Sequence, residues 1–249
     1  MESKKTSNES NLVALDRANV PPSSHQSIDK MAEIKSLDQD ELRRHKIIYA
    51  GTTDRPLLDA FRSLRTRLVQ QSGNKNFVVL ISSAARGGGG SLVSLNLAAA
   101  FALDSTKTSV IVDCNILEPR LDSMLSIPPD YGLTDYLLNP GIAMDDIIYS
   151  SGIPRLRMIP AGTRSELGAE LFSSSRMANL ISGLRERYED RYIILDAPSI
   201  EANAEVRILS EHCDQALMVV PYGKVTQSQI LGGVEVLGAD KFAGAIFND

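Results

Sequence analysis

The chain has 249 residues, with 26 Lys and Arg against 31 Asp and Glu, so its formal net charge is −5. Hydrophobic residues make up 43% of the sequence and charged residues 23%, which is enough apolar material for a full core and excludes wholesale disorder. The negative charge argues against a dedicated nucleic-acid-binding protein, because such proteins carry a strong basic excess. Two cysteines, Cys114 and Cys213, are too few for a disulfide scaffold or a four-cysteine metal site.

Membrane and export signals are not found in the sequence. No apolar run reaches the 18 residues expected of a transmembrane helix. The N-terminus, MESKKTSNES, lacks the apolar region of a secretory signal. The expected location is therefore the cytoplasm.

Residues 1–46 differ in composition from the rest of the chain. They are rich in Ser, Asn and charged residues, with two consecutive prolines at 21–22. We expect this segment to be a flexible charged arm, with a short helix over 31–45. Residues 47–249 are then expected to form one α/β domain, which starts with a short extended segment over 46–50.

Strand and helix patterns alternate after this point. The first is a helix over 57–70, because Leu58, Phe61, Leu64 and Leu68 recur at helical spacing. Short apolar runs of strand length then span residues 77–81, 109–112, 156–159, 192–195, 216–220 and 243–247. The further helices are expected over 91–103, 119–125, 175–188, 204–212 and 226–237. Near-continuous apolar strands predict a doubly wound, mostly parallel sheet with helices on both faces.

A glycine-rich loop follows the first strong strand. Residues 82–91 read SSAARGGGGS and lead directly into a helix. This arrangement is typical of a phosphate-binding loop, in which backbone N–H groups and the helix N-terminus attract an anion. The alternative is a flexible turn between a strand and a helix.

The loop lacks the lysine of the usual Gly-Lys-Ser/Thr ending, because Gly90 occupies the lysine position and Ser91 the hydroxyl position. That lysine normally stabilises charge on the transferred phosphate, so its absence predicts impaired phosphoryl transfer. Arg86 is the candidate substitute cation within the loop. Ser91 can still bind Mg²⁺.

Two acidic residues follow apolar strands. Asp113 ends the second predicted strand and Asp196 ends the fourth. In P-loop proteins such aspartates hold Mg²⁺ or its waters and orient the nucleophile. The alternative is that each carboxylate caps a loop or a helix, which is common at these junctions.

These motifs together resemble the bacterial tyrosine autokinases (BY-kinases) of capsule and exopolysaccharide synthesis. The resemblance extends to NLA at 96–98, VDCNILEP at 112–119, GLTDYL at 132–137, IPAG at 159–162, ELFSSSRM at 170–177, YIILDAP at 192–198 and GAIFN at 244–248. It covers about residues 57–248 and implies a P-loop NTPase-like fold of the MinD/ParA type. It also implies ATP or ADP with Mg²⁺ as the bound cofactor.

The resemblance implies roles for individual residues. Phosphates would be wrapped by Gly87, Gly88, Gly89 and Gly90. Mg²⁺ would be served by Ser91, Asp113 and Asp196, with Asp113 also the candidate base for a tyrosine hydroxyl and Arg86 the catalytic cation. Adenine would contact Asn248.

A further implied feature is assembly into a homo-oligomer. The positions of the family's Glu-x-x-Arg-x-x-Arg motif, which joins subunits into rings, are occupied by Asp59, Arg62 and Arg65. Asp is one methylene shorter than Glu, so the contact would be weaker. The alternative is a solvated helix face with a local ion pair.

The departures from the family pattern concentrate in the chemistry. Besides Gly90, the second acidic residue of the Asp-x-Asp motif is Asn115, and the paired arginines are Leu117 and Glu118. Arg86 and Gly88 replace the usual Pro and Glu of the loop. The tyrosine cluster expected at the C-terminus is not in the sequence, which ends at Asp249.

These features favour a regulatory protein of exopolysaccharide or capsule synthesis that is weak or inactive as a kinase. Its expected partner is a membrane-embedded chain-length (co-polymerase) protein, which would hold it peripherally at the inner membrane. One alternative is an active ATP-dependent tyrosine kinase that uses Arg86 or a partner's cation. A second is a MinD/ParA-like positioning ATPase, although Ala85 stands where those proteins carry a signature lysine.

Overall fold

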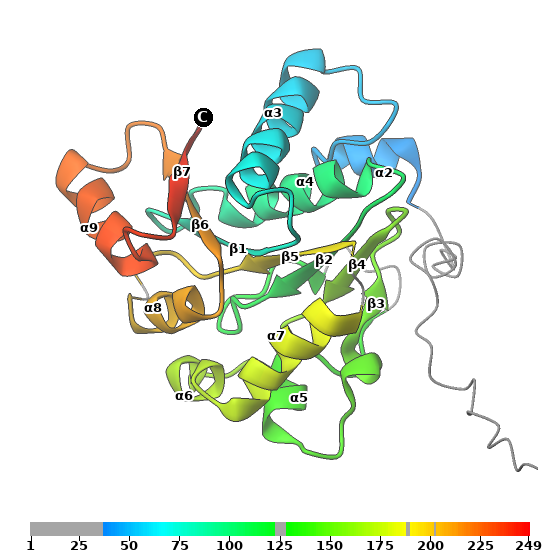
Figure 1. Cartoon of the computed structure of the whole chain (residues 1–249), viewed down its shortest axis with the longest axis vertical. Helices are drawn as coiled ribbons and strands as arrows, with labels where there is room; N and C mark the ends of the chain where they lie inside the picture. Colours follow the sequence, from blue (N-terminus) through cyan, green and yellow to red (C-terminus); the bar gives the residue numbers. More distant parts are fainter. Residues whose placement is uncertain (1–36, 123–127, 188–189, 202) are drawn as a thin grey trace, which may run out of the picture.

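A computed structural model describes residues 37–122, 128–187, 190–201 and 203–249. Its centre is a sheet with the strand order β3-β4-β2-β5-β1-β6-β7 (Figure 1). The strands are β1 (Val78–Ser83), β2 (Thr108–Asp113), β3 (Tyr149–Ser150), β4 (Leu156–Ile159), β5 (Arg191–Asp196), β6 (Gln215–Pro221) and β7 (Phe242–Asn248). Every pairing is parallel except that of β3 with β4. The doubly wound, mostly parallel fold predicted from the apolar runs is confirmed.

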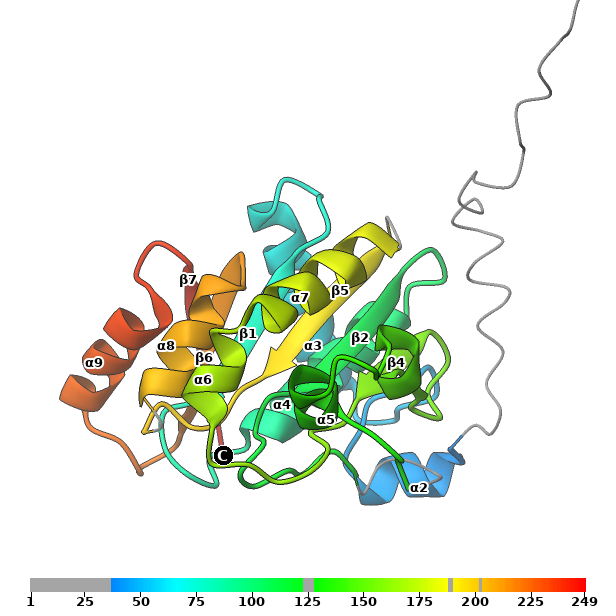
Figure 2. The same ribbon diagram turned by 90° about the horizontal axis from the view of Figure 1, so that it is seen from below.

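Helices cover both faces of this sheet. They are α2 (Gln39–Arg44), α3 (Arg55–Gln71), α4 (Gly90–Ala102), α5 (Leu133–Leu138), α6 (Gly168–Phe172), α7 (Ser175–Arg187), α8 (Asn203–Glu211) and α9 (Gln227–Leu237). Helices α2, α3 and α4 lie over one face, and α5 to α8 lie under the other (Figures 1 and 2). None of the helices in the described ranges has the length and apolar character to cross a membrane.

The two faces of β1 explain how its continuous apolar run is used. Val78 and Leu80 belong to the core on the side of α5 to α8, while Val79 and Ile81 belong to the core beneath α3 and α4. Because side chains alternate along a strand, a strand buried on both faces must be apolar at every position. This burial fixes the strand whose end carries the glycine loop.

Two local expectations fall on loops. Of the helix expected over 119–125, residues 119–121 are not helical, Asp122 is in a 3₁₀ turn, and residues 123–125 lie outside the described residues. There the N–H groups of Arg120 and Leu121 donate to the Asp113 carboxylate and hold the chain as a loop. The segment expected to be extended over 46–50 is irregular and begins with a positive φ at Lys46. It is held by Asn96, whose side chain accepts from the N–H of Ile48 and donates to the carbonyl of Lys46.

The expected arm lies mostly outside the described residues, as does the part of the expected 31–45 helix before residue 37. Within residues 37–46, α2 begins with a capping box between Asp38 and Glu41. Its Leu42 is buried in the same core as α3 and α4. The division of the chain at residue 46 stays a prediction.

Candidate functional site

The glycine loop joins β1 to α4 in a conformation that only glycine adopts easily. Gly87 has φ +67° and Gly89 has φ +87°, both in the left-handed region. A Cβ atom on Gly88 would collide with the Ser83 hydroxyl, and one on Gly89 would collide with the Asn248 amide. The loop is therefore a close-fitting cradle rather than a slack turn.

A cavity of about 500 Å³ opens beside this cradle. It is lined by the loop residues 85–92, by residues from the segment after β2, and by residues 197–199, Glu201 and Glu205 beyond β5. Its position at the carboxyl ends of parallel strands is the usual place for a ligand in such sheets. Gly90 also lines the cavity, and a Cβ there would lie 3.5 Å from Ser83, an ordinary contact. Steric crowding at the Cβ position therefore does not explain the missing lysine.

Arg86, the expected substitute cation, is already engaged. Its guanidinium forms an ion pair with the Glu118 carboxylate at the mouth of the cavity. The two side chains are 64% and 43% exposed. Glu118 stands at a position where the BY-kinase pattern has arginine, and its negative charge offsets the positive charge of Arg86.

Asp113 and Asp196 stand side by side at the ends of β2 and β5, where they pair in register. Both residues are fully buried. The Asp113 carboxylate accepts the backbone N–H of Asn115 at 3.0 Å and those of Arg120 and Leu121 at 3.3 and 3.2 Å. Burial and the nearby Asp196 charge raise the pKa of Asp113. Its carboxylate organises the following loop and does not line the cavity.

Asp196 is better placed to serve a metal ion. Its Oδ1 atom accepts a hydrogen bond from the Ser94 hydroxyl at 2.8 Å. Its Oδ2 atom is buried and has no hydrogen-bond partner among the described residues. Burial raises the pKa of Asp196, while the hydroxyls of Ser91 and Ser94 and the charge of Arg120 lower it in part.

The donors around Asp196 fit a magnesium ion that arrives with a nucleotide. Mg²⁺ commonly takes one or two protein oxygens and completes its shell with phosphates and water. Ser91 lines the cavity, and its hydroxyl lowers the pKa of Asp196. The Oδ2 atom of Asp196 accepts no hydrogen bond from the described residues, so it can serve as a ligand. Within the described ranges no group of three or more His, Cys, Asp and Glu residues could hold a metal without such a ligand.

Arg120 is a site residue that the sequence reasoning missed. It follows the family-like run 112–119 directly, and its side chain lines the cavity. The signal was a basic residue just past the positions where the family's paired arginines are replaced. It was overlooked because the helix expected over 119–125 hid the loop that brings Arg120 to the cavity.

A second cavity of about 460 Å³ adjoins the first, and the two share Leu92. Its lining includes the apolar side chains of Ile47, Leu57 and Phe61 together with Asn248. Asn248 does not line the first cavity, and its amide donates to the Gly88 carbonyl at 3.0 Å. The structure thus places the residue predicted to contact adenine beside the glycine loop.

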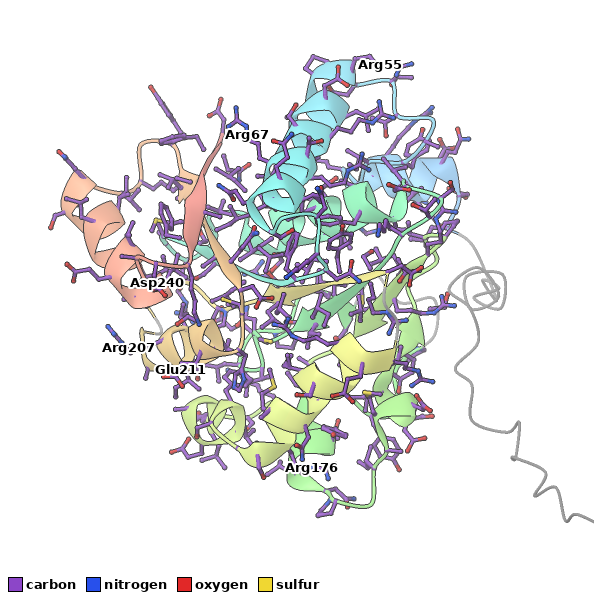
Figure 3. All side chains as sticks on the ribbon, viewed as in Figure 1. Arg55, Arg67, Arg176, Arg207, Glu211 and Asp240 are labelled. Carbon is purple, nitrogen blue, oxygen red and sulfur yellow. The ribbon has the colours of Figure 1, made fainter. Side chains whose placement is uncertain are left out.

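The predicted oligomer residues, Asp59, Arg62 and Arg65, lie on α3. None of the three lines either of these two cavities. Asp59 and Arg62 form an exposed ion pair at 3.9 Å. Arg65 instead donates to the carbonyl of Ala100 at 2.8 Å, near the end of α4. Of the other arginines of this helix, Arg55 stands at its start and Arg67 lies along its length (Figure 3). The three predicted residues therefore do not form one free surface.

The central sheet and the glycine loop together form a P-loop NTPase-like fold. Solved structures of the same fold include the kinase domain of VpsO (24% identity, TM-score 0.70, covering 84% of this chain and 97% of that one). The kinase domain of the Escherichia coli tyrosine kinase ETK matches with 22% identity, a TM-score of 0.72, and coverage of 89% and 85%. A ParA family ATPase from Chlorobium tepidum is more distant, with 21% identity, a TM-score of 0.52, and coverage of 70% and 74%.

The sequence relatives of the chain are bacterial tyrosine-protein kinases, so the resemblance drawn from the motifs is confirmed. YwqD of Bacillus subtilis is 29% identical over 193 residues, which cover 76% of this chain and 80% of YwqD. The kinase ptk of Acinetobacter johnsonii is 28% identical over 207 residues, which cover 82% of this chain. That match spans only 28% of the length of ptk. No family model matches the chain.

Proposed function

We propose that this chain is a BY-kinase-like regulatory protein of exopolysaccharide or capsule synthesis, weak or inactive in phosphoryl transfer. One observation carries the proposal: Gly90 stands at the lysine position, while the candidate replacement, Arg86, is paired with Glu118. Loss of a phosphate-gripping cation costs several kcal/mol of transition-state stabilisation, or on the order of 10³ in rate.

Asp113 adds a second deficit. A general base must come within hydrogen-bond reach of the proton that it removes. The Asp113 carboxylate is fully buried, accepts three backbone N–H groups and lies outside the cavity lining. A tyrosine hydroxyl in the cavity would not meet it without a rearrangement of the loop after β2.

Nucleotide binding remains compatible with the site. Backbone N–H groups of the glycine loop and the N-terminus of α4 would hold the phosphates. Ser91 and Asp196 would hold Mg²⁺, which supplies neutralisation of phosphate charge when bound. The base would enter the second cavity, where Asn248 and the apolar side chain of Leu92 face it.

The partner would be a membrane-embedded co-polymerase, and the chain would sit peripherally at the inner membrane through it. This part of the proposal is supported by the family resemblance and by relatives that are named tyrosine-protein kinases. The exposed Asp59–Arg62 pair on α3 would contribute to contacts between copies of the chain.

An active tyrosine kinase is the second candidate. Ser91 and Asp196 are retained: Ser91 lines the cavity, and the buried Asp196 carboxylate lies close enough to Ser91 for the Ser91 hydroxyl to lower its pKa. The MinD/ParA-like positioning ATPase is less favoured, because Ala85 occupies the signature lysine position and the likeness to such proteins is in the fold alone.

A single-turnover assay tests the proposal. The full chain is mixed with Mg²⁺ and γ-labelled ATP, alone and with a tyrosine-containing tail of the co-polymerase, and Asp113→Asn serves as the matched variant. We expect the wild type to incorporate no more label than Asp113→Asn. Incorporation that Asp113→Asn abolishes would establish the active kinase instead.

Genetic complementation tests the regulatory role. We expect the wild type and Asp113→Asn to restore polymer amount and chain length equally in a strain that lacks the gene. Failure of wild-type expression to change the polymer in that strain would refute the assignment to polysaccharide synthesis.

A further inference from the structure

We propose that Arg120 grips the terminal phosphate of a bound nucleoside triphosphate and so takes over the binding role, but not the role in phosphoryl transfer, of the lysine that is absent at Gly90. This inference rests on the proposed function, because it requires the cavity to bind a nucleotide. It goes further in giving the site a cation, a preference for triphosphate over diphosphate, and a role as a sensor of the bound nucleotide.

The position of Arg120 is the first support. It lies in the segment after β2, and it lines the same cavity of about 500 Å³ as the glycine loop. Its backbone is fixed, since its own N–H and that of Leu121 donate to one oxygen of Asp113. Leu121 is also buried in the core. A side chain on such an anchored backbone loses less freedom when it binds a ligand.

The distribution of charge is the second support. In the described part of the chain, the basic side chains that line the cavity are Arg86 and Arg120. The charge of Arg86 is offset by Glu118. Arg120 lines the same space from the segment after β2. It therefore brings a second positive charge to the cavity in which Ser91 would meet Mg²⁺ and the phosphates.

The chemistry of the guanidinium is the third support. Arginine offers a fixed fork of donors that matches phosphate oxygens and stays charged at all relevant pH values. A triphosphate carries one more phosphate than a diphosphate for this fork to bind. Because Asp113 is engaged by backbone donors, the cation can secure the triphosphate without a nearby base to start transfer. The site would thus report which nucleotide is present.

Titration calorimetry with Mg-ATP and Mg-ADP on the full chain tests this inference. Arg120→Ala is compared with Arg86→Ala, which removes the same residue type from the same cavity. We expect Arg120→Ala to weaken ATP binding about 10- to 100-fold and ADP binding much less. We expect Arg86→Ala to change the affinities for ATP and ADP by the same factor, and so to leave the preference for ATP unchanged, because Arg86 is paired with Glu118. Arg120→Lys should keep part of the preference for ATP.

The outcomes separate this inference from the proposed function. If the wild type binds neither nucleotide, the nucleotide site itself is refuted. If the wild type binds ATP and Arg120→Ala binds it equally well, the nucleotide site stands and the assignment of Arg120 is wrong.

A rescue experiment guards against a merely structural effect. Gly90→Lys is added to Arg120→Ala, because a side chain at residue 90 has room next to Ser83. We expect the lysine to restore the preference for ATP, with unchanged melting temperatures by circular dichroism. An equal loss of ATP and ADP binding that Gly90→Lys does not restore would show that Arg120 only shapes the loop, and would overturn the inference.

Discussion

The side-chain amide of Asn248 donates a hydrogen bond to the carbonyl oxygen of Gly88 over 3.0 Å. The bond joins the last strand of the sheet to the glycine loop, 160 residues apart in sequence. A Cβ on the adjacent Gly89 would collide with the same amide. The shape of the phosphate cradle therefore depends on β7 as well as on its own glycines.

Replacing Asn248 should loosen the loop. In Asn248→Ala the Gly88 carbonyl loses its side-chain donor, and we expect a loss of about 1 kcal/mol in the free energy of unfolding. Hydrogen exchange of peptides covering residues 84–92 should become faster, while that of β2 should not change. Asp249→Ala is the neighbouring control. Unchanged exchange in the loop of Asn248→Ala would contradict this role.

Three alanine substitutions should separate the glycines of the loop. Gly88→Ala should destabilise the protein by about 1–3 kcal/mol, because its Cβ meets Ser83 and the Ala85 carbonyl. Gly87→Ala has open space but a positive φ, so a cost of about 1 kcal/mol is expected. Gly90→Ala, within α4, should be neutral or stabilising by up to about 1 kcal/mol. Urea unfolding measures all three, and a large loss in Gly90→Ala would contradict the structure.

Releasing Arg86 should strengthen nucleotide binding. Glu118→Gln removes the carboxylate that pairs with Arg86, so we expect ATP affinity to rise about two- to fivefold, as suits an exposed pair. Glu201→Gln is the matched control, because it removes a carboxylate from the same cavity lining. Calorimetry checks both variants. An equal rise in the two would mean that the net charge of the cavity, rather than the freed arginine, is responsible.

The buried aspartate pair predicts a dependence of stability on pH. Burial raises the pKa of Asp196 in the folded protein, so the folded state holds a proton that the unfolded chain releases. The contribution of this group to stability therefore falls as pH rises from about 4 through its raised pKa, and is constant above it.

Asp196→Asn tests that dependence. Its amide oxygen can still accept from Ser94, and it removes the buried charge. We expect a gain of about 1 kcal/mol at pH 8, or roughly 2–4 °C in Tm, which disappears near pH 4. Thermal unfolding at several pH values measures it, with the exposed Asp240→Asn as control (Figure 3). A variant less stable than the wild type at pH 8 would contradict the sign.

The α3 arginines should behave differently from each other. Arg65→Ala removes the bond to the Ala100 carbonyl and should cost about 1 kcal/mol in the free energy of unfolding. Arg62→Ala removes only an exposed ion pair and should change stability by less than about 0.5 kcal/mol. Sedimentation velocity should show that Arg62→Ala reduces self-association. Equal association of this variant and the wild type would refute the contact proposed for Asp59 and Arg62.

Local patterns accounted for most of the fold. The apolar runs that became β1, β2 and β4 to β7 were visible because buried parallel strands must be apolar at nearly every position. The two-residue strand β3 was missed, since Tyr149–Ser150 is too short to show any alternation. Helices α5 and α6 were also missed, because five or six residues hold too few turns for a helical period.

The sequence by itself determined the order of strands and helices, the glycine loop after β1, the aspartates at two strand ends and the absence of lysine at residue 90. Each of these features is visible in a short run of consecutive residues. Only the tertiary structure decided that Glu118 pairs with Arg86, that Asp113 faces backbone N–H groups, and that Arg120 and Asn248 reach the loop's surroundings. The contacts of Glu118 and Asn248 join segments far apart in the chain, which the sheet brings to one edge. Those of Asp113 depend on the path of the loop after β2, which no local pattern shows.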